Sequence, residues 1–178
     1  MMSGRLSINE IVKRGIFAGA AGGLAEMIWV TLYAMASGGN AANLARGVTT
    51  AAGVSALLPA APVSMGIAVH MALAVLLGVA LVGLWQALAP RGSGVISLFG
   101  VMLAALACVW TMNFFVLLPV ISPSFAQIIP YPVSLISKLL FGLAAAETMR
   151  RSAAEQAARM PAAVAVRASH IKAKFPSN

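Results

Sequence analysis

The chain has 178 residues, enough for one domain, and 61% of them are hydrophobic while only 9% are charged. A typical soluble domain carries about 25% charged residues, so composition excludes a water-soluble globular protein, which could not cover its surface with these side chains. The formal net charge is +8, yet the Lys and Arg residues gather at the ends of apolar stretches. That placement indicates membrane topology and anionic lipid rather than nucleic-acid binding.

Four apolar segments are long enough to cross a bilayer, because a hydrocarbon core about 30 Å thick needs about 20 helical residues. In lipid each segment must satisfy its own backbone hydrogen bonds, which predicts α-helices. The sequence therefore predicts an all-α fold, an integral membrane four-helix bundle over residues 15–149. Its transmembrane helices are expected at about 15–36, 63–87, 95–119 and 131–149.

The connections between these segments differ in character. The first is rich in Gly, Ala, Asn and Thr, and its middle, Ala41–Leu58, is predicted to hold a short interfacial helix capped by Asn40. The second, Pro90–Gly94, is a tight polar turn that predicts an antiparallel hairpin of the second and third helices. The third is rich in proline and is predicted to fold back onto the membrane surface, with Tyr131 at headgroup level.

The distribution of Lys and Arg predicts the orientation of the helices. Basic residues precede the first helix, include Arg91 in the central turn and follow the fourth helix, whereas the opposite side has only Arg46. By the positive-inside rule both termini lie in the cytoplasm, and residues 1–14 and 150–178 are the two cytoplasmic ends. We therefore expect a multi-pass protein of a bacterial inner membrane.

Two features of the ends leave alternatives open. Ala34-Met35-Ala36 follows a basic segment and a long apolar run, as a secretory cleavage site does, so cleavage between Ala36 and Ser37 is an alternative to an uncleaved first helix. In the basic C-terminal segment, Pro161 is expected to interrupt a helix. Residues 162–178 are then expected to be disordered, or to touch anionic lipid.

Glu26 is the most informative residue, because a charged group near the middle of a transmembrane helix costs roughly 3 kcal/mol and must face protein or water. At 1.5 Å per residue it lies about 16 Å above Gly15, and Lys138 lies about 18 Å above Arg150 on the fourth helix. Equal depth predicts an intramembrane Glu26–Lys138 ion pair. The alternatives are a Lys138 side chain that reaches outward to the interface and a protonated Glu26.

Small residues recur at helical spacing and mark close contacts between helices. The stripes comprise Gly15, Gly19, Gly22 and Gly23 in the first helix, Gly66, Ala74 and Gly78 in the second, and Gly142 in the fourth. His70 lies on the second stripe, at a depth similar to Asn113, which predicts an interhelical hydrogen bond between them. Haem ligation through His70 is the functional alternative, with a methionine as the second axial ligand.

The sequence lacks the residue patterns of common enzymes. It contains no H-E-x-x-H, C-x-x-C, G-x-S-x-G or phosphate-binding glycine loop, and Cys108 is its one cysteine. A cysteine-based metal cluster is therefore excluded, and we expect neither a metal site, nor a cofactor, nor enzymatic activity.

Several features together resemble one family. The chain has a Gly-rich first helix, a His near the start of the second, a Pro-rich third loop, and a last helix that ends Glu147-Thr148-Met149-Arg150-Arg151. This combination resembles the YagU-like bacterial inner-membrane proteins over much of residues 15–151. The resemblance implies an inner-membrane location and no defined activity.

Three functions are compatible with these features of the sequence. The leading interpretation is a non-catalytic accessory subunit that packs against other membrane subunits or itself through its small-residue helix faces. The second is a small transporter or channel component, for which Glu26, Lys138, His70, Asn113 and Ser134 are the polar candidates. The third is a haem-binding membrane protein. The second differs from the first in requiring the polar residues to gather in one place.

Overall fold

The computed structural model describes the backbone of residues 6–89, 93–126 and 128–174, and over these residues it is helical without strands. Within these described ranges four helices are long and apolar enough to cross a membrane, as the sequence predicts. They are α1 (Ile8–Ala36), α3 (Pro62–Leu88), α4 (Val95–Met112) with its continuation through η1 (Asn113–Leu117) and α5 (Leu118–Ile121), and α7 (Tyr131–Lys174). Two short helices, α2 (Ala41–Ala51) and α6 (Pro123–Ala126), lie in the connections.

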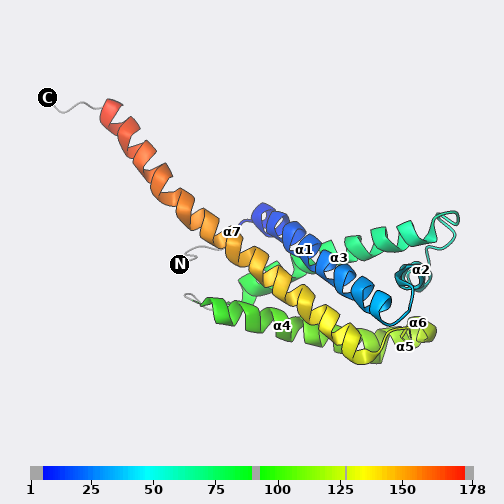
Figure 1. Cartoon of the computed structure of the whole chain (residues 1–178). Coiled ribbons are helices and arrows are strands. Elements are labelled where there is room, and N and C mark those ends of the chain that lie inside the picture. Colours follow the sequence, from blue (N-terminus) through cyan, green and yellow to red (C-terminus); the bar gives the residue numbers. More distant parts are fainter. Residues whose placement is uncertain (1–5, 90–92, 127, 175–178) are drawn as a thin grey trace.

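The helix α1 lies between α3 and α7 (Figure 1). It packs along α3 on one side and along α7 on the other, and α4 packs on α7. Although α3 and α4 follow each other in sequence, they contact each other only sparsely, so the antiparallel hairpin that the short turn predicts is not closely packed. The physical reason is that α1 carries glycines toward both α3 and α7, which lets these two helices approach it most closely. Residues 90–92 of the turn, including Arg91, lie outside the described residues.

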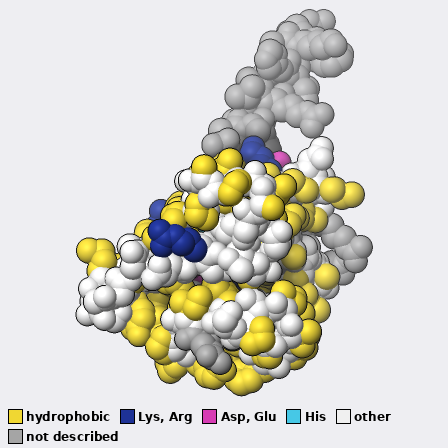
Figure 2. Space-filling model, turned by 90° about the vertical axis from the view of Figure 1, so that its right-hand side faces the viewer, with side chains coloured by type: hydrophobic (Ala, Val, Ile, Leu, Met, Phe, Trp, Pro, Cys, Tyr) yellow, Lys and Arg dark blue, Asp and Glu magenta, His cyan; other side chains and the backbone are white. Residues whose placement is uncertain are grey.

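The two ends of the arrangement differ in composition. The terminal end holds the start of α1, the end of α3 and the start of α4, and α7 extends beyond it (Figure 1). The loop end carries α2, α5 and α6, and Figure 2 shows that its surface is mostly hydrophobic or uncharged, with few Lys or Arg side chains. Arg5 lies outside the described residues. The side chain of Arg14 is buried at the terminal end, 3.5 Å from Glu10.

The helix α1 begins seven residues earlier than the apolar run suggests, because its start is set by a cap rather than by hydrophobicity. The Oγ atom of Ser7 accepts a hydrogen bond from the backbone N–H of Glu10 at 3.3 Å. Ser7 followed by Glu10 has the Ser-x-x-Glu spacing of a capping box, a signal that could have placed this boundary from the sequence. At the other end of α1, Gly38 adopts a positive φ of 70°, which only glycine accepts readily, and closes the helix.

The helix α2 starts where the sequence predicts but ends earlier. The Oδ1 atom of Asn40 accepts a hydrogen bond from the N–H of Ala42 at 2.9 Å. Gly53 has a φ of 69°, and the N–H of Val54 donates to the carbonyl of Thr49 at 3.2 Å, as in a Schellman motif. This motif stops the helix at Ala51.

Thr49 fastens α2 to the start of α3. Its side chain is buried, and its hydroxyl lies 2.6 Å from the carbonyl oxygen of Pro62 and 3.1 Å from that of Ala45. We expect Thr49→Val to lower the free energy of unfolding by about 1 kcal/mol, because the carbonyl of Pro62 loses its buried donor. Thr50→Val is the matched control, since the exposed hydroxyl of Thr50 bonds only within its own helix. Chemical denaturation in detergent micelles measures both, and equal effects would refute the fastening role.

The helix α7 continues past the predicted membrane segment. Pro161 does not interrupt it, and its backbone is helical to Lys174, so the expectation of a broken and disordered tail was wrong for residues 162–174. A proline removes one helical N–H donor at a cost of about 3 kcal/mol, and the Ala-rich flanks on both sides have the highest helix propensity to offset it. Residues 175–178 lie outside the described residues.

Candidate functional site

The glycines of α1 bring α3 and α7 close enough for polar side chains to meet. A Cβ atom built on Gly19 would lie 2.7 Å from the Cα of Val75 on α3, and one built on Gly22 would lie 2.6 Å from the ring of Phe141 on α7. Gly78 of α3 in turn faces the backbone of Gly15 and Gly19. These small residues are therefore used for packing within the chain, in one continuous three-helix contact.

The remaining small residues have different neighbours. Gly23 faces Ala74 of α3, and a Cβ atom on Gly142 would lie 3.3 Å from the carbonyl oxygen of Met102 on α4. Gly66 faces Ala45 of α2, so it admits the short connecting helix rather than another long one. The sequence could mark these positions as close contacts, but it could not say which helix occupies each.

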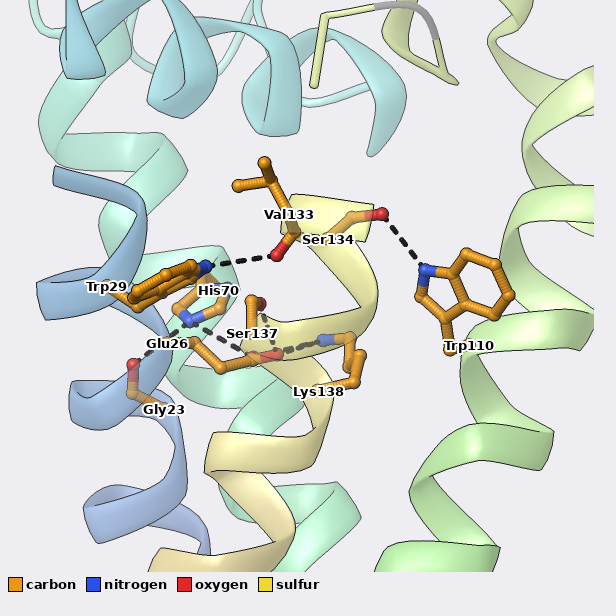
Figure 3. A network of polar contacts seen from close by, with 9 residues as sticks. All are labelled: Gly23, Glu26, Trp29, His70, Trp110, Val133, Ser134, Ser137 and Lys138. Carbon is orange, nitrogen blue, oxygen red and sulfur yellow. Dashed lines mark hydrogen bonds and ion pairs between the residues drawn. The ribbon is translucent and has the colours of Figure 1, made fainter. Parts of the chain in front are cut away.

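The structure brings Glu26 and Lys138 together (Figure 3). The Lys138 Nζ atom lies 2.7 Å from Oε1 of Glu26 and 3.0 Å from Oε2, so the ammonium group contacts both carboxylate oxygens. The hydroxyl of Ser137 also donates to Oε1, at 3.0 Å. The Glu26 side chain is 3% exposed, whereas that of Lys138 is 20% exposed. The carboxylate is thus buried between the helices, and the partly exposed Lys138 side chain covers it on one side.

His70 joins this group from α3 instead of pairing with Asn113. Its Nε2 atom lies 3.8 Å from Oε2 of Glu26 and 3.4 Å from the carbonyl oxygen of Gly23. Asn113 is at the start of η1, on the helix that hardly touches α3. The predicted His70–Asn113 hydrogen bond is not among the contacts of the described residues, because the expected α3–α4 packing does not form.

Two tryptophans connect to the same part of α7 (Figure 3). The Nε1–H of Trp29 donates to the carbonyl of Val133 at 3.0 Å, and that of Trp110 donates to the hydroxyl of Ser134 at 2.9 Å. The sequence alone does not indicate either of these hydrogen bonds. Ser134, Ser137 and Lys138 have the i, i+3, i+4 spacing of one helix face, and this pattern was the available signal.

An aromatic cluster adjoins this face at the loop end. The ring of Trp110 lies 5.6 Å from that of Phe114 and 5.5 Å from that of Phe115, and both phenylalanines also contact Tyr131. Phe114 and Phe115 are consecutive, and both meet Trp110 because η1 is a π-helix, in which the wider turn brings i+5 as well as i+4 onto one side. The cluster holds the start of α7 against α4.

The polar groups around Glu26 carry charge and form hydrogen bonds, but in the described part of the chain they do not include the ligands of a metal site. Among the described residues no three His, Cys, Asp or Glu side chains gather. Cys108 is exposed on α4. The Glu26 group contains one carboxylate, one ammonium, one imidazole and one hydroxyl, which suits transient binding of a proton or a small charged species.

No protein-family model, curated protein or solved structure matches this chain. The fold itself defines a class: a helical protein whose four long apolar helices suggest a multi-pass membrane protein. Within that class the distinguishing feature is the buried group of Glu26, Ser137, Lys138 and His70, which we call the charge cluster.

Proposed function

We propose that this chain is a non-catalytic multi-pass protein of a bacterial inner membrane, with both termini in the cytoplasm, that works as a small transporter or channel component. The observation that carries this proposal is the charge cluster, in which three of the four long helices contribute an ionisable side chain to one point. Ionisable residues at membrane depth are costly, and they usually mark the paths of ions, protons or substrates.

The position of the polar candidates favours transport over an accessory role. Of the five residues considered in the sequence, Glu26, Lys138 and His70 meet directly, and Ser134 lies one helical turn from Ser137 on the same face of α7. Such convergence is what a transport site needs. The small-residue faces that favoured an external partner face α1, α2, α3, α4 and α7 of the same chain.

An accessory subunit is the second candidate, and one observation favours it. The helix α4 packs mainly on α7, and exposed apolar side chains follow α4 and its continuation, such as Ile96 in α4, Phe115 in η1 and Val120 in α5. A helix from another subunit has room to pack there. The resemblance to YagU-like proteins is consistent with either function and stays a prediction, as does the expectation that no cofactor is bound.

Ion flux into proteoliposomes tests the transport proposal. The purified chain is reconstituted, and the fluxes of H⁺, Na⁺, K⁺ and Cl⁻ are followed under an imposed gradient. We expect one of these fluxes to exceed that of protein-free liposomes and to fall about tenfold in Glu26→Gln, equivalent to about 1.4 kcal/mol of lost stabilisation. Glu155→Gln is the matched control, because Glu155 is an exposed acid of α7 outside the charge cluster. Equal fluxes in both variants and the wild type would exclude a transport site at Glu26.

A further inference from the structure

The polar side chains of the bundle are distributed unevenly along its length. The buried polar residues of the described chain are Arg14, Glu26, Thr49, Ser122, Ser134 and Ser137. All except Arg14 lie at the level of Glu26 or nearer to the loop end. The other buried polar side chains therefore lie in the part of the bundle between the charge cluster and the loop end.

One face of α7 leads from the loop end to Glu26. At the first turn, the hydroxyl of Ser134 donates to the carbonyl of Tyr131 at 2.9 Å and accepts from Trp110. The next turn presents Ser137 and Lys138, which bind Glu26 (Figure 3). At 1.5 Å per residue, Lys138 is about 10 Å along the helix from Tyr131. Hydrogen-bonding groups thus occur at every turn of this stretch.

Beyond Glu26, towards the terminal end, the core is apolar. Phe141 follows Lys138 by less than one turn, is fully buried, and has its ring against Gly22. Ala18, Met102, Leu106 and Ala145 are also fully buried in the same cluster. These buried apolar side chains provide no hydrogen-bond donor or acceptor for a proton or an ion that leaves Glu26 in that direction.

We infer that Glu26 is a proton-binding site that is reached from the loop end alone, which under the positive-inside orientation is the periplasmic side. This inference rests on the proposed function and names its substrate class. The proton adds to a carboxylate oxygen of Glu26, its contact with the Lys138 ammonium opens, and release of the proton restores the ion pair. No other atom changes its bonding, so the step balances.

Three polar side chains from two helices face Glu26. Lys138 and Ser137 face it from α7, and His70 faces it from α3, with Nε2 at 3.8 Å. Lys138 acts as a tethered cation that occupies the site when no proton is bound. A fifth of the Lys138 side chain and a quarter of the His70 side chain are exposed, so the charge cluster is not fully enclosed by the helices.

Silver-ion accessibility tests the one-sided approach in the full-length chain. Cys108 is first replaced by Ala, and single cysteines are introduced by Ser134→Cys, Ser137→Cys and Ala145→Cys. Ag⁺, a small monovalent cation that binds thiols, is applied to right-side-out or inverted vesicles, and the unreacted thiol is then counted by maleimide labelling. We expect Ser134→Cys and Ser137→Cys to react at least about tenfold faster from the periplasmic face, and Ala145→Cys to react slowly from both. Faster reaction from the cytoplasmic face, or equal rates from both faces, would overturn the inference.

Infrared titration tests whether the ligand is a proton. The reconstituted chain is titrated, and one component of the protonated-carboxyl band is expected to rise as the pH falls and to be missing in Glu26→Gln, whereas the components of Glu10, Glu147 and Glu155 remain. Ser137→Ala keeps the charges of the cluster, so it should retain the band even if Glu26→Gln folds poorly. A band that is insensitive to pH, or one that responds to Na⁺ instead, would overturn proton binding. One-sided access and titration without any Glu26-dependent flux would leave this inference standing and refute transport.

Discussion

Lys138→Met is expected to lower the free energy of unfolding by about 3 kcal/mol, because it leaves the enclosed Glu26 carboxylate without its cation. The Nζ atom is 2.7 Å from Oε1, and Glu26 is 3% exposed, so solvent cannot replace the lost charge without opening the helices. Methionine keeps most of the length of the lysine side chain, which limits the effect of lost packing. Thermal or denaturant unfolding in detergent, followed by circular dichroism, measures the change.

The double variant Glu26→Leu/Lys138→Met separates pairing from packing. Removing both charges relieves the unpaired carboxylate, so the double variant should be clearly more stable than Lys138→Met alone. Lys13→Met, at an exposed lysine of α1, is the control for a general loss of positive charge, and it should change stability by less than about 0.5 kcal/mol. If the effects of the two single substitutions simply added, Glu26 and Lys138 would not act as a pair.

Gly78→Val is expected to destabilise the bundle by about 3 kcal/mol or more, because its side chain would meet backbone atoms that cannot move aside. A Cβ atom at this position falls on the carbonyl of Gly15 and on the backbone of Gly19. To admit it, α1 and α3 must separate, and this separation also moves His70 away from Glu26. We therefore expect the flux of the proteoliposome experiment to fall together with stability.

Gly83→Val supplies the matched control for this prediction. Gly83 lies in the same helix as Gly78, and a Cβ atom there meets nothing within 4 Å. The two variants share the change in backbone entropy and helix propensity, so the difference between them reports the contact with α1 alone. Unfolding midpoints in detergent give that difference, and similar losses in both variants would show that the α1–α3 crossing does not depend on Gly78.

The charge cluster illustrates what residue spacing can and cannot predict. Equal depth of Glu26 and Lys138 follows from counting residues along two helices of opposite direction, and the structure places them in contact. His70 was assigned to Asn113 because their depths match too, yet His70 lies against α1. The depth of a residue along its helix can thus be predicted from the sequence, whereas the helix that it contacts depends on how the helices pack.

Periodic features of the sequence by themselves determined the four long apolar helices and the positions of close contact, because each follows from local hydrophobicity and side-chain size. Only the tertiary structure decided that α1 lies between α3 and α7, that α3 and α4 stay apart, and that Ser137 and two tryptophans complete the polar network. Which helices become neighbours in a bundle depends on how well the faces of all the helices pack together at the same time. The packing of all faces cannot be read from the sequence of any single helix.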